Sequence, residues 1–141
     1  MSKRRWIGVL ILFGITLIAF PGFAAQEVRF ALFSDPHYYD NSLGVTGEAF
    51  EAYLTADRKM IAESEAILKA AIDAVAASNV QFLIIPGDLT KDGELSSHQE
   101  MAAYLQGLED QGIQVYVTPG NHDINNPDSF AYDGPNTIPV P

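Results

Sequence analysis

The sequence contains no cysteine. Disulfides, thiolate metal sites, a cysteine nucleophile and a lipid-modified cysteine anchor are therefore excluded. Basic residues are also scarce, with 8 Lys and Arg against 18 Asp and Glu. We expect no nucleic-acid-binding surface on such an acidic chain, because affinity for phosphate backbones comes mainly from Lys and Arg. The chain would attract a small anionic substrate only where bound metal ions supply positive charge.

The first 25 residues have the features of a secretory signal peptide. Three basic residues, Lys3 to Arg5, precede an apolar run from Trp6 to Phe20, and small residues follow at Ala24 and Ala25. The run is shorter than the roughly 20 residues of a spanning helix. We therefore expect cleavage after Ala24 or Ala25, export to the periplasm, cell surface or medium, and no stable membrane span in the mature protein. The alternative is an uncleaved N-terminal anchor.

Beyond residue 26, strand and helix patterns alternate. Short apolar runs predict three strands, over residues 28–33, 80–85 and 114–118. Helical patterns follow the first two strands: a leading helix or turn over 48–56, an apolar stripe over 60–75, and a helix that Ser97 begins through a capping box with Glu100. Turn residues predict loops over 34–47 and 121–141. The fold class is therefore α/β, with a parallel β-α-β-α-β core.

A polar cluster follows each predicted strand. The clusters are Ser34-Asp35-Pro36-His37, Gly87-Asp88-Leu89-Thr90 and Gly120-Asn121-His122-Asp123. In a parallel sheet all three would emerge at the carboxyl edge, where α/β folds bind ligands. Carboxylate and imidazole ligands suit Zn, Fe or Mn, and one carboxylate can bridge two ions. The sequence therefore predicts a metal site at this edge.

The three clusters, in this order and after strands, resemble the first three motifs of the calcineurin-like metallophosphoesterases. The resemblance begins near Val28. It implies an incomplete calcineurin-like phosphoesterase fold, half of an α/β/β/α sandwich, with residues 26–141 forming the N-terminal part of a truncated metallophosphoesterase domain. The implied activity is metal-dependent hydrolysis of a phosphomonoester or phosphodiester substrate.

The resemblance also implies roles for individual residues. Asp35 and His37 would bind a first metal ion, Asp88 would bridge two ions, and Asn121 would bind the second. The ions would be two divalent or trivalent ions, Mn, Fe or Zn, which would polarise the phosphoryl oxygens and activate water. His122 would bind no metal. It would contact the phosphate, or protonate the leaving oxygen.

The chain departs from the family pattern in two places. Where the family often has an aspartate that orients the catalytic histidine, this chain has Lys91. Either Asp92 or Asp123 could orient His122 instead, or neither does. No histidine follows Asp123, although the family draws further ligands from later motifs. We therefore expect a fragment or a truncated gene product that has weak or no activity by itself.

Less specific readings also have to be considered. The alternatives to an enzyme are a non-catalytic α/β module that binds at most one divalent ion, and an inactive remnant. The run from Lys91 to Glu94 is most simply a solvated turn. His98 is expected to face solvent or to support the site from behind, and Tyr38 and Tyr39 to pack within their loop. The sequence does not predict the oligomeric state.

Overall fold

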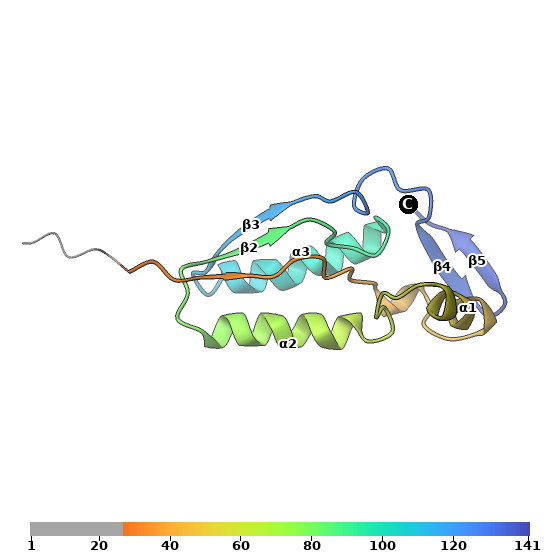
Figure 1. The fold of residues 1–141 in the computed structure, drawn as a ribbon, viewed down its shortest axis with the longest axis horizontal. Coiled ribbons are helices and arrows are strands. Elements are labelled where there is room, and N and C mark those ends of the chain that lie inside the picture. The colour runs from red at the N-terminus through yellow and green to blue at the C-terminus, as the bar shows by residue number, and fades with distance from the viewer. Residues whose placement is uncertain (1–26) are drawn as a thin grey trace, which may run out of the picture.

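The computed structural model describes residues 27–141 (Figure 1). The predicted signal peptide, residues 1–25, lies outside this range. The described strands are β1 (Phe30–Leu32), β2 (Phe82–Pro86), β3 (Gln114–Thr118), β4 (Phe130–Asp133) and β5 (Asn136–Pro139). The helices are α1 (Glu48–Ala56), α2 (Ser64–Ala77) and α3 (Leu95–Glu109), with a short 3-10 turn, η1, at Asn41–Leu43. Within residues 27–141, no helix is both long enough and apolar enough to cross a bilayer.

The first three strands form the predicted parallel sheet, in the order β1-β2-β3. In the central strand β2, Leu83 lies opposite Ala31 of β1 and Val115 of β3. Apolar runs form these strands because the covering helices shield their side chains from water, most completely in the central strand. The parallel β-α-β-α-β core is thus confirmed.

Both long helices cover the same face of this sheet. Leu83 and Ile85 of β2 point into this face and are fully buried. They pack against apolar residues of the two helices: Leu68, Ile72 and Val75 of α2, and Met101, Leu105 and Leu108 of α3. The helical stripes are therefore explained by one shared core, which holds the two helices parallel to the sheet (Figure 1).

The opposite face of the sheet carries apolar side chains that nothing in the described chain covers. Phe30, Leu32 and Tyr116 are 53%, 59% and 54% exposed. The Phe30 ring stacks on Phe82 with centroids 5.3 Å apart, which extends the apolar surface across two strands. One helix layer on one sheet is half of the predicted four-layer sandwich, so the fold is a partial one.

The segment 121–141 is not a loop throughout, and that prediction is wrong in its second half. β4 and β5 pair antiparallel, with Asp133 opposite Asn136 and a two-residue turn at Gly134-Pro135. Gly134 has a φ of 57°, which glycine adopts at no steric cost. A glycine-led two-residue turn is a hairpin signal, and the prolines of the segment obscured it.

The hairpin packs with α1 beyond the carboxyl ends of the parallel strands (Figure 1). A second small core joins them, made of Tyr39, Phe50, Ile61 and Tyr132. The Tyr39 hydroxyl donates a hydrogen bond to the Phe130 carbonyl oxygen at 3.1 Å. Tyr39 is fully buried, so it packs as expected, although its buried partners lie on α1, at Ile61 and on the hairpin rather than within its own loop.

The predicted capping box at Ser97 is also wrong. α3 begins two residues earlier, at Leu95. Ser97 is buried inside the first turn, and its hydroxyl accepts a hydrogen bond from the Asp40 N–H at 3.1 Å. The Ser97 side chain therefore makes a long-range contact with Asp40 instead of the helix cap that the local pattern predicted.

Candidate metal centre

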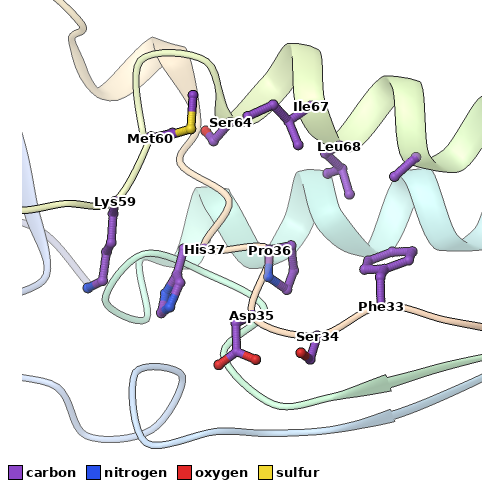
Figure 2. A pocket seen from close by; sticks show the side chains of 11 residues that line it. Phe33, Ser34, Asp35, Pro36, His37, Lys59, Met60, Ser64, Ile67 and Leu68 are labelled. Carbon is purple, nitrogen blue, oxygen red and sulfur yellow. The ribbon is translucent and has the colours of Figure 1, made fainter.

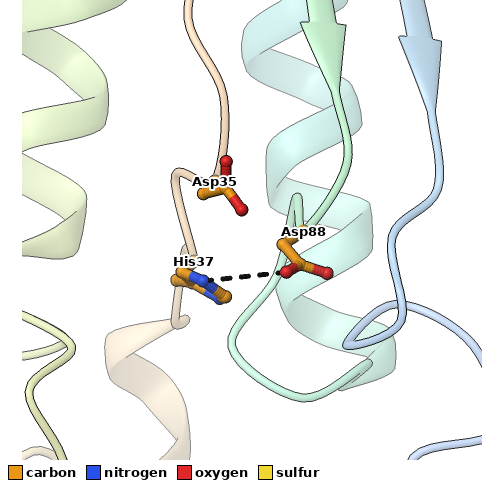
Figure 3. Close-up of side chains that lie close together, drawn as sticks. All are labelled: Asp35, His37 and Asp88. Atoms are coloured by element: carbon orange, nitrogen blue, oxygen red, sulfur yellow. Dashed lines mark ion pairs between the residues drawn. The ribbon is translucent and has the colours of Figure 1, made fainter.

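The loops after β1 and β2 bring three of the predicted ligands together. One ligand atom from each of Asp35, His37 and Asp88 lies within 4.8 Å of the others. Figure 3 shows the three side chains converging from the two loops. Main-chain hydrogen bonds hold the loops side by side, since His37 N–H donates to the Asp88 carbonyl oxygen at 3.1 Å and Asp35 N–H donates to that of Gly87.

The backbone at these positions is unusual. Asp35, His37 and Asp88 have φ angles of 53°, 42° and 45°, in the left-handed region that residues other than glycine rarely adopt. Such strain is kept where the surroundings impose it, and it concentrates at functional sites. Along residues 27–141 only one other non-glycine residue, Asn125, shares this conformation. The coincidence of strain with candidate ligands supports a site at this position.

His37 has the chemistry of a metal ligand. Its Nδ1 is buried, and its Nε2 lies 3.9 Å from Asp88 Oδ2. Burial, reinforced by the nearby charge of Lys59, lowers the pKa of His37 below its usual value. The imidazole is therefore neutral near pH 7, which is the form that binds metal.

Asn121, the fourth predicted ligand, is exposed, and its neighbours tie it to the same edge. His122 N–H donates a hydrogen bond to Asp88 Oδ1 at 2.9 Å. On the other side, a Cβ atom at Gly120 would collide with the Asp88 carboxylate, so only glycine permits this approach. The loop after β3 is thus pressed against Asp88, with Asn121 at its tip.

The structure identifies the group that orients His122. Its Nδ1 lies 2.7 Å from Asp92 Oδ1, so of the three alternatives left open by the sequence (Asp92, Asp123 or neither), Asp92 holds the ring. Asp123 has a different role. Its carboxylate accepts hydrogen bonds from the N–H groups of Leu89, Thr90 and Gly120, which fastens the second loop to the third.

The run from Lys91 to Glu94 is not a solvated turn, and that interpretation is corrected. Lys91 and Glu94 are fully buried and Asp92 is nearly so. Lys91 Nζ lies 2.5 Å from Asp92 Oδ2 and 3.4 Å from Glu94 Oε1. Three tyrosine rings surround the ammonium group, the closest being Tyr53 with its centroid at 4.7 Å. Carboxylates and aromatic faces together offset the loss of hydration.

This buried lysine keeps Asp92 ionised. Burial alone would raise the pKa of Asp92. Hydrogen bonds from Lys91 and His122, with the charges of Lys91 and Lys59, outweigh burial and hold the pKa below its usual range. An ionised Asp92 accepts the Nδ1 proton of His122 and leaves Nε2 of the ring for a ligand.

Sequence reasoning missed Lys59 entirely, because it follows no strand and belongs to no motif. Its Nζ lies 3.2 Å from His122 Nδ1, 3.4 Å from Asp92 Oδ1 and 3.3 Å from the Lys91 carbonyl oxygen. His98, half-buried, supports the site from behind, with Nε2 3.3 Å from the Asp123 carbonyl oxygen.

Two cavities flank the site. The first, of about 350 Å³, runs from Asp35 and His37 along apolar side chains of α2 (Figure 2). The second, of about 330 Å³, is bounded by His122, Asp92, Tyr53 and the β4–β5 hairpin. Lys59 lines both. A ligand held at Asp35, His37 and Asp88 would therefore have room on both sides.

The donor set fits a metal ion. Two carboxylates and a neutral imidazole are ligands that Zn, Fe and Mn accept. Ligand atoms bonded to one such ion at roughly 2.0–2.2 Å lie at most about 4.4 Å apart. The three side chains, whose ligand atoms lie within 4.8 Å of one another, would therefore draw slightly closer around an ion.

Comparison with known proteins gives a consistent result. A sequence model of the calcineurin-like phosphoesterases matches residues 28–140. A relative named as a probable cyclic nucleotide phosphodiesterase, from Vesicomyosocius okutanii subsp. Calyptogena okutanii (strain HA), is 34% identical over 59 residues. These residues are 42% of this chain and 24% of the relative, so the match spans about a quarter of that protein's length.

Proposed function

This chain belongs to the calcineurin-like phosphoesterase family, and from that premise we propose that it hydrolyses phosphoesters with a dinuclear metal centre held at the rim of its parallel sheet. The observation that carries the proposal is the convergence of Asp35, His37 and Asp88 on strained backbone, beside a histidine held by a buried carboxylate. The substrate class is a phosphomonoester or a phosphodiester.

In this proposal Asp35 and His37 would hold one ion, Asn121 would hold the second, and Asp88 would be a ligand to both. Bound ions of this kind polarise phosphoryl oxygens and activate water. Asp88 also accepts the His122 N–H at 2.9 Å, so the same carboxylate fixes the loop that carries Asn121. Gly120 allows this close approach because a side chain there would displace the Asp88 carboxylate.

His122 acts on the substrate through Nε2. Asp92 holds the Nδ1 proton, and the ring packs edge-on against His37 with centroids 5.0 Å apart, so its orientation is fixed. With Nδ1 protonated, Nε2 of the neutral ring is an acceptor, so His122 donates from Nε2 only in its imidazolium form. In that form Nε2 either donates a hydrogen bond to a phosphoryl oxygen or transfers its proton to the leaving oxygen. Each action stabilises charge that develops during bond cleavage.

The test is hydrolysis of p-nitrophenyl phosphate and bis(p-nitrophenyl) phosphate by the full-length protein loaded with Mn²⁺. We expect turnover that a chelator removes and added metal restores, with two ions per chain. Asp88→Asn, which tolerates the left-handed backbone, should lower kcat/KM by about a thousandfold or more. Asp73→Asn, an exposed change on α2, should have no effect. A single bound ion with no turnover of either ester would instead indicate a non-catalytic module.

We further propose that the protein is exported, on the basis of the basic and apolar pattern of residues 1–25. Expression of the full-length protein with cell fractionation and N-terminal sequencing tests this. The expected mature N-terminus follows Ala24 or Ala25. Recovery of the intact N-terminus in the cytoplasmic fraction would contradict export, and its recovery in the membrane fraction would identify an uncleaved anchor.

A further inference from the structure

Lys59 lies between the candidate metal ligands and His122. The proposed mechanism assigns it no role. Its side chain is only 14% exposed, and its backbone N–H donates to Asp57 Oδ1 at 2.8 Å, which fixes the start of the side chain. Its positive charge contributes to the lowered pKa of His37, and its Nζ lies 3.2 Å from His122 Nδ1. It is therefore a cation held within reach of both histidines.

The hydrogen bonds of Lys59 leave part of its capacity unused. An ammonium group has three N–H donors. The Lys91 carbonyl oxygen and Asp92 Oδ1 accept two of them, at 3.3 Å and 3.4 Å. His122 Nδ1 does not accept the third, because its 2.7 Å bond to ionised Asp92 requires the proton to be on Nδ1.

The location of the remaining donor points to an anionic ligand. Lys59 is a wall of both cavities that flank the site, and Figure 2 shows its side chain beside His37, from which the first cavity extends. The ammonium group lies 3.2 Å from His122 Nδ1, so it is held beside this ring. An anionic oxygen bound beside the two histidines would be within reach of the Lys59 ammonium.

We propose that Lys59 binds a non-bridging oxygen of the substrate's phosphoryl group. This inference rests on the proposed phosphoesterase function and adds to it a positive contact supplied by the chain itself. The contact would serve substrate and product alike, since each carries such an oxygen. It would also explain how a chain with a formal net charge of −10 retains an anion between cavities that are partly lined by carboxylates.

The experiment measures inorganic phosphate binding to the full-length, Mn²⁺-loaded protein by isothermal titration calorimetry. Lys59→Met should weaken phosphate binding by about tenfold or more, as expected for loss of a hydrogen bond to a charged group. Lys59→Gln, which keeps N–H donors for Lys91 and Asp92 but removes the charge, should weaken it similarly, and Lys59→Arg should restore most of the affinity. Lys69→Met, an exposed lysine on α2, is the matched control.

The metal content and melting temperature of each variant separate the possible outcomes. Weakened phosphate binding with unchanged metal content and folding supports the inference. Unchanged phosphate affinity in both Lys59→Met and Lys59→Gln overturns it, as does loss of metal in these variants, which would assign Lys59 to the metal site. Absence of ester hydrolysis in the wild type would refute the proposed function, whereas an effect-free Lys59→Met in an active enzyme would refute only this inference.

Discussion

The Asp92 carboxylate holds the buried Lys91 ammonium and the His122 ring. Oδ2 pairs with the buried Lys91 ammonium, and Oδ1 receives the Nδ1 proton of His122. Asn126 donates a further hydrogen bond to Oδ1 at 3.0 Å. Each partner keeps the carboxylate charged inside the protein, so its influence on His122 depends on Lys91, a residue that no substrate reaches. Stability and activity are therefore linked at this residue.

Replacing Asp92 by Asn should impair both. An amide at this position cannot balance the buried Lys91 charge, so we expect the free energy of unfolding to fall by about 3 kcal/mol. It also cannot hold His122 in the same way, so kcat should fall by about a hundredfold. Urea unfolding and ester hydrolysis measure the two effects, with Asp73→Asn as the control. If the variant has normal stability and normal kcat, the contacts of Asp92 contribute to neither stability nor catalysis.

Asp123 predicts a pH dependence of stability. Burial raises its pKa, but hydrogen bonds from Gly120, Thr90 and Leu89 outweigh burial and lower the pKa below the ordinary value. A lowered folded-state pKa means that the stabilisation is complete above the unfolded pKa of about 3.9 and is lost as pH falls through the folded value.

The difference in unfolding free energy between wild type and Asp123→Asn isolates this contribution. It should be constant from about pH 7 to pH 5 and should shrink below about pH 4. Urea titrations at a series of pH values provide the measurement. A difference that already declines near pH 6 would mean that another group is responsible.

The sequence predicted the meeting of Asp35, His37 and Asp88, because parallel strands end at one edge; their role as ligands stays a proposal. It did not predict the surroundings of Lys91. In the sequence this residue lies in a charged stretch. Its burial depends on several tyrosines, and one of them, Tyr132, belongs to a hairpin that the local pattern did not reveal. Lys59 was missed for the same reason, since only tertiary contacts bring it to His122.

The β4–β5 hairpin closes the second cavity. Two glycines allow it to pack closely against the preceding loop. Gly44 has a φ of 94° and lies against the Tyr132 carbonyl, where a Cβ atom would overlap the oxygen. Gly47, with a φ of 102°, lies similarly against Gly134, whose carbonyl oxygen accepts the Ala49 N–H at 3.0 Å. The hairpin is therefore fixed by main-chain contacts that leave no room for side chains.

Gly44→Ala should destabilise the protein by roughly 1–3 kcal/mol, through the left-handed backbone and the overlap with Tyr132. Gly107→Ala is the matched control, because this glycine lies within α3 and an added Cβ would meet no atom within 4 Å. That change should stabilise the helix by about 0.5–1 kcal/mol. Thermal unfolding of both variants gives the comparison, and equal effects of the same sign would contradict this account of the hairpin.

Elements were predictable where local patterns and packing agree. β3 was predicted with its exact bounds, and β2 was close, because an apolar run and a buried strand coincide. α2 begins at Ser64 although apolar residues start earlier, since Ile61 leaves the helical stripe and packs into the second core with Tyr39. The start of α3 was wrong because Ser97 bonds to Asp40 rather than to its own helix.

At the scale of the whole molecule, one layer of helices covers one face of the sheet and leaves the other bare. The bare face gathers aromatic and aliphatic side chains from all three parallel strands, including Phe30, Leu32 and Tyr116. Contiguous apolar surface of this kind is uncommon on isolated soluble domains. The α/β class followed from strand order in the sequence, and the incomplete sandwich from the resemblance to the family. The packing of both helices on one face required the structure.

The bare face should make the 141-residue chain self-associate. Leu32→Glu places a charge on this surface and should shift the chain toward monomer in sedimentation velocity experiments, with weaker binding of a hydrophobic dye. Ile124→Glu, at an equally exposed apolar residue away from the sheet, is the control. Equal behaviour of the two variants would show that the sheet face does not drive association.

The left-handed backbone of Asp35, His37 and Asp88 has a consequence for how ions arrive. Each such residue costs roughly 1–3 kcal/mol, and the chain meets that cost when it folds rather than when it binds. The rim is thus preorganised, and little conformational entropy remains to be lost on capture. We therefore expect metal uptake in one rapid step, without a slow rearrangement of the loops, and a melting temperature that rises with free metal concentration.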